Sequence, residues 1–351
     1  MTYFRGNIEA MSAYVPGEQP PPGAKVIKLN TNENPYPPAP AAMAILRDFD
    51  ADLLRRYPHP LAERFRQCVA EVLGVPVDWV LPGNGSDDLV TMIGRACAGP
   101  GRPVAYAVPT FEFYITQAQI QAADRVEAAY DEQYNLPVDE LLAAEPAVTF
   151  VASPNSPSGT AVPRQQLGRL ASGLSGVLVI DEAYVDFADG DALELVRRHE
   201  NVLVLRTLSK GYSLAGLRLG YAVANPGLLA GLMKVKDIYN VSAVACAVGA
   251  AAMEDQAHKA ANAEKVKASR EALRGQLQRL GFNVWPSQAN FLLARPPEGD
   301  AEGLYEALKA RGILVRYFKH RRLVDKLRIT VGTDEQNAAL VGALSDLLAK
   351  T

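Results

Sequence analysis

The stretch GVLVIDEAYVDFADGDALELVRRHENVLVLRTLSKG, residues 176–211, decides the fold class. It contains two apolar runs, at 176–181 and 201–206, which are separated by a segment of helical character over 192–199. Both runs are continuously apolar rather than alternating in polarity, which is typical of strands that are covered on both faces. A strand, a helix and a second strand in this order favour a parallel pair of strands joined by a helix.

The same alternation continues upstream of this stretch. Further continuous apolar runs lie at 103–108 and 147–152, and a helical pattern over 164–174 follows the second of them. Four such runs separated by helical segments predict an α/β fold, with a large domain whose mainly parallel sheet is flanked by helices.

Near residue 255 the pattern changes. A long helix over 258–280 is expected to lead into a smaller α+β domain that ends in a closing helix. Its other elements are predicted as a strand at 290–294, a helix at 303–311, a strand around 313–316 and a strand at 327–332.

The N-terminal region has a different character. Prolines are dense over 16–40, and this segment cannot form a regular helix because proline lacks the amide donor. It indicates an extended arm with one short strand at 26–29. The expected division is an arm with part of the small domain at 1–45, a large domain at 46–255 and a small C-terminal domain at 256–351.

Composition narrows the classes of partner. The 351 residues carry a formal net charge of -3, so no basic field is expected for nucleic acid or an anionic membrane. No segment resembles a signal peptide, and the longest apolar stretch, 241–253, is too short to cross a bilayer. The three cysteines lack metal-binding or disulfide spacing, so we expect no metal site and a cytoplasmic protein: Cys68, Cys97 and Cys246.

Polar and aromatic side chains follow the four apolar runs. In open parallel sheets, ligands bind outside the carboxyl ends of the strands. Taken singly, each residue has an ordinary explanation, such as a solvated lysine or an aspartate that caps a helix. Their occurrence at successive strand ends favours an active site. In chain order they are Phe111, Asn155, Asp181, Tyr184, Thr207, Ser209 and Lys210.

A glycine-containing segment adds a possible phosphate site. The sequence GNGSD, residues 83–87, precedes an apolar helix predicted over 89–98. Free amides and the positive end of a helix dipole attract phosphate, and Ser86 and Asp87 would supply such amides. Most segments of this kind only cap a helix, so this signal is weak when it stands alone.

Together these residues match the needs of pyridoxal-phosphate (PLP) chemistry. That chemistry requires a lysine for a Schiff base, a carboxylate that keeps the pyridine nitrogen protonated, and donors for the phosphate. Lys210, Asp181 and Ser209 are of these types, and Arg218 follows the lysine by eight residues. Arginine suits phosphate because its planar guanidinium donates two parallel hydrogen bonds.

Seven motifs carry a resemblance to one family. The sequence resembles the histidinol-phosphate aminotransferases, which belong to the aspartate-aminotransferase-like superfamily of PLP enzymes, over nearly its whole length and in the same order. The motifs are NTNENPYP (30–37), GNGSDD (83–88), PTFEFY (109–114), SPNSPSG (153–159), DEAYVDF (181–187), TLSKGYSLAGLRLGY (207–221) and LRITVGT (327–333).

The resemblance implies roles around the cofactor. Lys210 would be the Schiff-base lysine and would carry the proton between Cα and C4′. Asp181 would pair with the pyridine nitrogen, Tyr184 would hydrogen-bond the phenolic oxygen, and Phe111 would stack on the ring. The phosphate would be held by the amides of Ser86 and Asp87, the hydroxyls of Thr207 and Ser209, and Arg218.

The resemblance also implies a homodimer and a substrate site. Tyr57 would reach the phosphate of the neighbouring subunit's cofactor. The substrates would be histidinol phosphate and 2-oxoglutarate, with imidazole acetol phosphate and glutamate as products. Arginines would bind the anionic groups of these substrates, because a guanidinium suits carboxylate and phosphate equally. The implied substrate residues are Tyr14, Glu33, Asn34, Arg316 and Arg328.

The chain departs from the superfamily pattern at one cofactor contact. The superfamily often has Asn immediately before the second proline of the SPNSPSG motif, and this Asn binds the phenolic oxygen. Here Ser156 occupies that position. We assign the role to the preceding Asn155. Asp88, which replaces a common glutamate, is expected only to support the helix start.

Two alternatives remain open on the sequence alone. The same scaffold could carry an aromatic-amino-acid aminotransferase or a phospho-threonine decarboxylase, because these share the cofactor residues. The alternative from another class is a non-catalytic phosphate-binding protein. Such a protein would most simply lack one of Lys210, Asp181 or Arg218, and all three are present. The sequence has neither the GxGxxG nor the GxxxxGK[ST] motif of nucleotide binding.

Overall fold

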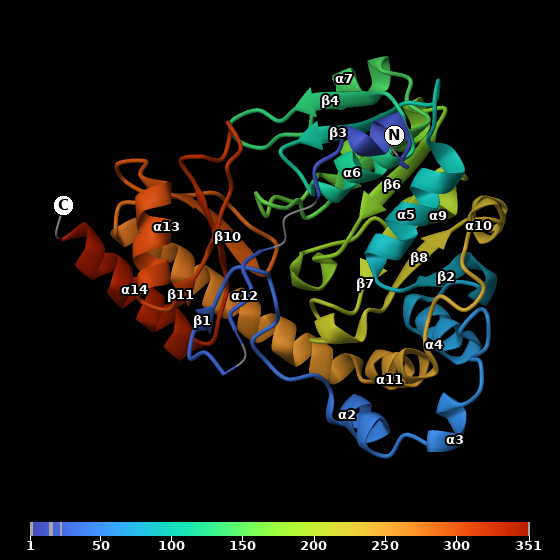
Figure 1. Ribbon diagram of the computed structural model, residues 1–351, viewed down its shortest axis with the longest axis horizontal. Coiled ribbons are helices and arrows are strands. Elements are labelled where there is room, and N and C mark those ends of the chain that lie inside the picture. Colours follow the sequence, from blue (N-terminus) through green and yellow to red (C-terminus); the bar gives the residue numbers. More distant parts are fainter. Residues whose placement is uncertain (1–2, 14–16, 22, 350–351) are drawn as a thin grey trace.

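Seven strands form the central sheet of the larger part of the protein, in the order β2-β8-β7-β6-β5-β3-β4 (Figure 1). The structure is a computed structural model that describes residues 3–13, 17–21 and 23–349. β8 is antiparallel to both of its neighbours, and the other adjacent pairs are parallel, which confirms the predicted α/β class. The strands are β2 (Val80–Gly83), β3 (Val104–Val108), β4 (Arg125–Ala129), β5 (Val148–Ala152), β6 (Val177–Asp181), β7 (Val202–Thr207) and β8 (Gly220–Ala224).

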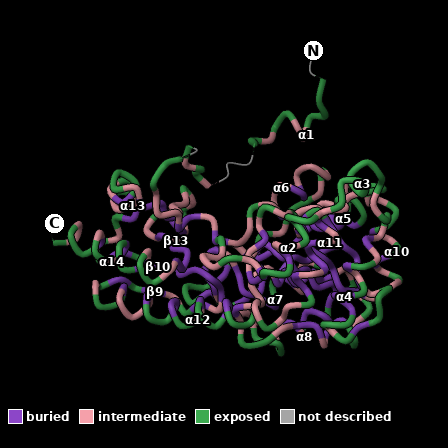
Figure 2. Tube along the Cα trace, turned by 90° about the horizontal axis from the view of Figure 1, so that it is seen from below, coloured by how far each residue is buried: buried purple, intermediate pink, exposed green. Residues whose placement is uncertain are grey.

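Helices cover both faces of this sheet. Successive residues of a strand point to opposite faces, and on β6 Leu178 and Ile180 join one buried cluster while Val179 joins the other. The buried residues accordingly form a continuous interior beneath the helices (Figure 2). One face is covered by α4 (Glu63–Leu73), α7 (Val138–Ala143), α8 (Arg164–Gly173), α9 (Leu193–Arg198) and α11 (Ala243–Glu254), and the other by α5 (Ser86–Cys97), α6 (Phe113–Ile120) and α10 (Pro226–Met233).

A long helix, α12 (Gln256–Arg279), leads from the larger part to the C-terminal part (Figure 1). There a four-stranded antiparallel sheet has the order β12-β13-β10-β9 and packs against α12 and the closing helix. Within the described residues no helix is long and apolar enough to cross a membrane. The elements are β9 (Asn283–Val284), β10 (Phe291–Arg295), α13 (Ala301–Ala310), β12 (Arg316–Tyr317), β13 (Leu327–Thr330) and α14 (Asp334–Leu348).

The N-terminal arm crosses to the C-terminal part. Its strand β1 (Ile27–Lys28) pairs in parallel with β11 (Ile313–Leu314). One continuous strand around 313–316 was therefore a wrong prediction: the first half hydrogen-bonds to the arm, and the second half forms β12 against β13. The arm begins with α1 (Gly6–Glu9) and continues beyond β1 into α2 (Pro40–Arg47) and α3 (Ala51–Leu54).

The helix predicted over 89–98 begins three residues earlier. α5 starts at Ser86, because Gly85 adopts a φ of +82° and turns the chain directly from β2 into the helix. The polar residues Ser86, Asp87 and Asp88 thus form its first turn rather than a preceding loop. This places the free backbone amides of α5 beside the ends of the central strands.

Candidate active site

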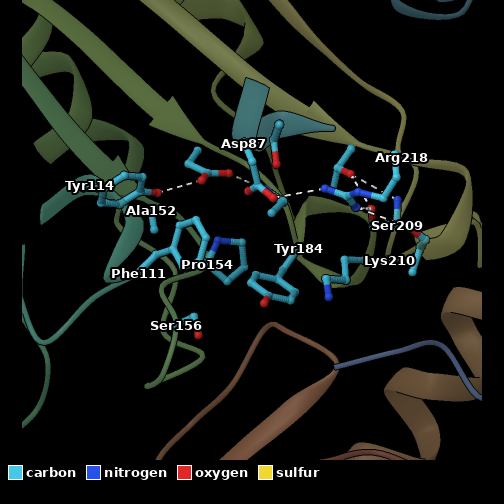
Figure 3. Close-up of a pocket in the computed structure, with 15 residues that line it drawn as sticks. Asp87, Phe111, Tyr114, Ala152, Pro154, Ser156, Tyr184, Ser209, Lys210 and Arg218 are labelled. Carbon is cyan, nitrogen blue, oxygen red and sulfur yellow. Dashed lines mark hydrogen bonds and ion pairs between the residues drawn. The ribbon is translucent and has the colours of Figure 1, made fainter. Parts of the chain in front are cut away.

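A cavity lies at the carboxyl ends of β3, β5, β6 and β7, where the sequence predicts the site (Figure 3). We call it the first cavity. Ala152, Pro154, Ser156 and Tyr114 also contribute to its wall. It brings together nine of the predicted cofactor residues: Ser86, Asp87, Phe111, Asp181, Tyr184, Thr207, Ser209, Lys210 and Arg218.

One end of the first cavity is rich in donors suited to an anion. Arg218 adopts a left-handed φ of +55°, which turns its side chain towards the N-terminus of α5. Its Nη2 lies 3.0 Å from Asp87 Oδ2, and its Nη1 donates to Ser209 Oγ at 3.5 Å. Thr207 Oγ1 donates to Ser209 Oγ at 2.9 Å, so the Thr207 hydroxyl is linked to the guanidinium through Ser209.

A glycine is needed for this arrangement. A Cβ atom built on Gly85 would lie 2.5 Å from Arg218 Nη2, so any other residue would displace the guanidinium. The left-handed φ of +82° at the same residue also favours glycine. The motif GNGSD is therefore more than a helix cap here, because its glycine allows Arg218 to approach the first turn of α5.

A buried carboxylate lies at the opposite end. Asp181, the last residue of β6, is 5% exposed and accepts hydrogen bonds from Tyr114 Oη at 2.6 Å and from the Ala183 amide at 3.0 Å. Burial raises the pKa of Asp181 to about 6, although both hydrogen bonds favour the ionised form. Tyr114 is itself held by stacking on Phe150, with 4.6 Å between ring centroids.

Lys210 lines the same cavity, three residues beyond the end of β7 (Figure 3). Its Nζ donates to the carbonyl of Thr31 at 3.2 Å and is 5.8 Å from the centre of the Tyr184 ring. Tyr184 Oη accepts a hydrogen bond from Asn32 Nδ2 at 2.9 Å. The N-terminal arm thus supplies contacts to both side chains.

Phe111 and Pro154 form a wall of the first cavity next to Tyr184 (Figure 3). Phe111 meets Tyr114 edge to face, with ring centroids 5.5 Å apart. Packing of this kind fixes the plane of Phe111, which can then stack on a flat ligand.

A second cavity adjoins the first and shares Phe111, Ser156, Tyr184 and Lys210 with it. The predicted substrate arginines, Arg316 on β12 and Arg328 on β13, both line this cavity and are Cα partners across the two strands. Arg328 donates to Ser156 Oγ at 3.0 Å and to the carbonyl of Asn30 at 2.9 Å. Two guanidinium groups therefore face one space beside Lys210.

Asn155 and Ser156 occupy different surroundings. Asn155 is fully buried and does not line either cavity: its amide donates to Pro109 O at 3.3 Å and Ser158 Oγ at 2.9 Å and accepts from Thr110 Oγ1 at 2.8 Å. Ser156 lines both cavities. The geometry therefore places Ser156, rather than the predicted Asn155, within reach of a ligand.

Three further predicted residues, Glu33, Asn34 and Tyr57, line neither cavity. Glu33 forms an ion pair with Lys28 at 2.7 Å, and Asn34 donates to the backbone carbonyl of Lys210 at 3.0 Å. Tyr57 is 81% exposed and stacks on Tyr239, with ring centroids 4.5 Å apart. Tyr14, predicted as a substrate contact, lies outside the described residues.

Sequence reasoning missed three contacts at this site. The hydroxyl of Tyr114, the carbonyl of Thr31 and the amide of Asn32 touch Asp181, Lys210 and Tyr184 respectively. All three residues occur within motifs that carry the family resemblance. No residue type or spacing within those motifs indicates which distant side chain each one meets.

Comparison with known proteins identifies the family. The family described as aminotransferase class I and II matches residues 24–344. Over 346 residues the chain is 62% identical to histidinol-phosphate aminotransferase 1 of Trichormus variabilis, covering 99% of both proteins. It is also 45% identical over 355 residues to histidinol-phosphate aminotransferase of Geobacter sulfurreducens, covering 99% of this chain and 100% of that relative.

A solved structure shares the fold over the whole chain. The crystal structure of histidinol-phosphate aminotransferase from Sinorhizobium meliloti in complex with pyridoxal-5′-phosphate has a TM-score of 0.91 and 25% sequence identity, covering 100% of this chain and 98% of that one. The chain therefore belongs to the class I and II aminotransferases, a family of PLP-dependent enzymes. Within that family it is a member of the histidinol-phosphate aminotransferases.

This membership confirms two predictions made from the sequence. The chain is an enzyme of the aminotransferase class, and its family is the one that the seven motifs resemble. The curated relatives favour histidinol phosphate over the aromatic-amino-acid and phospho-threonine alternatives. A non-catalytic phosphate-binding protein has no support from them.

Proposed function

We propose that this protein uses PLP to transfer the amino group of histidinol phosphate to 2-oxoglutarate, giving imidazole acetol phosphate and glutamate in histidine biosynthesis. One observation carries the proposal. Lys210 lines one cavity together with the Asp181 carboxylate and the Arg218 guanidinium. The 62% identity to a histidinol-phosphate aminotransferase supports the choice of substrate.

The donor set of the first cavity fits the cofactor. Asp181 is a buried carboxylate whose hydrogen-bond partners among the described residues, Tyr114 and the Ala183 amide, are uncharged, and a pyridinium would supply an opposite charge. At the other end, Arg218, Thr207 and Ser209 with the first turn of α5 would hold the phosphate, and Gly85 leaves room for the guanidinium. Phe111 would stack on the ring.

Each residue of the site would then have its own role in holding or transferring a proton. Bound PLP supplies an electron-withdrawing ring that makes the substrate Cα–H acidic. The Lys210 amine would form the covalent link to the cofactor and, once released from it, would move a proton between substrate Cα and C4′. Asp181 would keep the pyridine nitrogen protonated, and the Tyr184 hydroxyl would donate to the phenolic oxygen. Phe111 and Pro154 would cover one side of the cofactor ring.

The second cavity suits a substrate with an anion at one end and a ring at the other. Arg316 and Arg328 would bind the phosphate of histidinol phosphate or a carboxylate of glutamate, so one site accepts both. The remaining wall includes apolar side chains together with a carboxylate and an imidazole. They are Phe111, Ile115, Phe318, Leu323, Glu112 and His320.

Glu112 offers a way to distinguish an imidazole from a phenyl ring. Its carboxylate accepts hydrogen bonds, and an imidazole N–H can donate one whereas a phenyl ring cannot. Burial lowers the pKa of His320, which favours the uncharged form of this neighbour beside an imidazole substrate. The proposal therefore favours histidinol phosphate over phenylalanine.

The proposal is tested with a panel of amino donors against 2-oxoglutarate. Histidinol phosphate is expected to react far faster than phenylalanine, and Glu112→Gln is expected to reduce that preference without changing the half-reaction with glutamate. Comparable rates with both donors in the wild type would refute the substrate assignment. Release of carbon dioxide without glutamate formation would instead identify a decarboxylase.

The proposal includes a homodimer in which Tyr57 reaches the neighbouring cofactor phosphate. Exposed apolar side chains support a self-association surface around it: Leu54 is 64% exposed and Ile238 is 70% exposed. Leu54 belongs to α3, which lies with α2 on the α11 side of the protein (Figure 1). The segment that carries Ile238 is held against the Tyr57 region by the Tyr57–Tyr239 stack.

Sedimentation tests the dimer. Leu54→Asp is expected to give monomers with weakened cofactor binding, whereas Val324→Asp, an exposed apolar residue of the C-terminal part, is expected to leave the dimer intact. A wild-type monomer with full cofactor affinity would contradict this part of the proposal. Tyr57→Phe is expected to weaken cofactor binding without changing the oligomeric state.

Two further expectations belong to the same proposal. The chain divides at about residues 45 and 255 into an arm with part of the small domain, a large domain and a small C-terminal domain; the pairing of β1 with β11 supports assigning part of the arm to the last of these. A cytoplasmic location is supported by free Cys68, Cys97 and Cys246.

A further inference from the structure

Three consecutive residues of the N-terminal arm, Asn30–Asn32, touch three functional side chains. The first carbonyl of this segment accepts from Arg328 at 2.9 Å, and the second accepts from Lys210 at 3.2 Å. The third residue donates through its side-chain amide to Tyr184 Oη at 2.9 Å. The cavity residues that these contacts reach lie more than 150 positions further along the chain.

The last of these contacts has a defined direction. Asn32 is 1% exposed and adopts a φ of +56°, which asparagine tolerates better than most residues. Its backbone N–H donates to Thr330 Oγ1 at 3.0 Å, so the Thr330 hydroxyl uses its own proton towards Asn32 Oδ1 at 3.1 Å. The oxygen of the amide therefore faces Thr330, and Nδ2 must face Tyr184.

This direction decides what the Tyr184 hydroxyl can do. Because Oη accepts from Asn32, its own proton remains available for donation elsewhere, and Tyr184 lines both cavities. Lys210 Nζ is 5.8 Å from the centre of the Tyr184 ring and donates to the carbonyl of Thr31.

We propose that Asn32 is a positioning residue that directs the Tyr184 hydroxyl proton into the cavity, towards the phenolic oxygen of the cofactor. The inference rests on the proposed function, since it concerns PLP bound at Lys210. Thr330 contributes to this positioning, because its hydroxyl holds the Asn32 amide in the required orientation. The arm would thus control the direction of a hydrogen bond to the cofactor through Tyr184.

The test replaces Asn32 with an acceptor of the same size. In Asn32→Asp the carboxylate only accepts, so the Tyr184 hydroxyl turns its proton towards residue 32 and away from the cavity. A hydrogen bond donated to the phenolic oxygen favours its anion and lowers the pKa of the proton shared with the Lys210 linkage. Its loss is expected to raise the midpoint of the spectroscopic pH titration of the bound cofactor by about one pH unit.

A double-variant comparison separates proton direction from the added charge. The negative charge of Asn32→Asp acts with or without the Tyr184 hydroxyl, whereas the direction of its proton matters only when the hydroxyl is present. We therefore expect Tyr184→Phe to raise the midpoint by itself, and Asn32→Asp to add much less in that background than in the wild type. An equal shift in both backgrounds would overturn the inference.

Two further variants control for folding. Asn32→Gly suits the left-handed φ and removes the amide, so a smaller shift in the same direction is expected. Asn337→Asp changes another buried asparagine, whose side-chain amide bonds to Gly332 alone among the described residues, and its midpoint is expected to match the wild type. An unchanged midpoint in both Asn32 variants would overturn this inference and leave the proposed function intact. A wild-type protein without a lysine-linked cofactor band overturns the proposed function and this inference together.

Discussion

Replacing Tyr114 with phenylalanine removes one hydrogen bond of Asp181, the carboxylate proposed to pair with the pyridine nitrogen. The variant loses the hydroxyl that donates to Asp181 at 2.6 Å but keeps the ring that stacks on Phe150. A hydrogen bond to a charged group contributes about 1.5–3 kcal/mol, and one pKa unit corresponds to about 1.4 kcal/mol. Loss of this bond therefore raises the pKa of Asp181 from about 6 by roughly one to two units.

The sign of the effect on cofactor binding follows from the raised pKa. A protonated Asp181 must lose its proton before it can pair with a pyridinium, so affinity falls below the pKa and recovers above it. With a pKa near 7.5 in the variant, its dissociation constant for PLP is about fourfold that of the wild type at pH 7. At pH 8.5 the two proteins differ by only about 10%.

Equilibrium binding of PLP between pH 6 and 8.5 measures the ratio of the two dissociation constants. Titration of the cofactor phosphate affects both proteins equally and therefore cancels from this ratio. Tyr106→Phe is the matched control, because its buried hydroxyl bonds to Glu127 instead of a cavity residue. A ratio that does not vary with pH would refute the reasoning, as would an equal loss in Tyr106→Phe.

Three further perturbations have defined outcomes. Asp181→Asn is expected to weaken PLP binding most above pH 6 and to converge with the wild type below it, because Asp181 is then protonated in the wild type as well; binding titrations at pH 5 and 8 check this. Arg328→Gln is expected to raise the KM for both glutamate and histidinol phosphate by roughly tenfold or more, since each anion loses a charge-assisted hydrogen bond; a change for only one substrate would contradict a shared anion site. Gly85→Ala places a Cβ 2.5 Å from Arg218 Nη2 and is expected to lower affinity for PLP and for free phosphate, whereas Gly190→Ala, where a Cβ meets nothing within 4 Å, should bind both normally.

The sequence was most informative where function follows directly from a strand. Asp181 ends β6, and Lys210 lies three residues beyond β7, so both positions follow from the apolar runs that precede them. Parallel strands end at the same edge of a sheet, which brings these side chains together whatever the loops do. The same argument predicts Phe111 beyond β3.

Contacts between distant segments were beyond this kind of reasoning. Asn32 and Tyr184 are 152 positions apart, and Thr31 and Lys210 are 179 apart, so no local pattern joins them. The antiparallel strand β8 was missed because GYAVA follows the lysine loop without a helix that would signal it. For Asn155 and Ser156, residue type favoured the amide, but burial placed the amide in the loop interior and the hydroxyl at the cavities.

Chemical trapping tests the role of Lys210 most directly. The protein is mixed with PLP, reduced with borohydride and digested, and the labelled peptide is sequenced. A single label is expected on Lys210 in the peptide that contains TLSKGYSLAGLR. A label on another lysine such as Lys28 or Lys259, or no label at all, would contradict the covalent attachment on which the assignment of this enzyme rests.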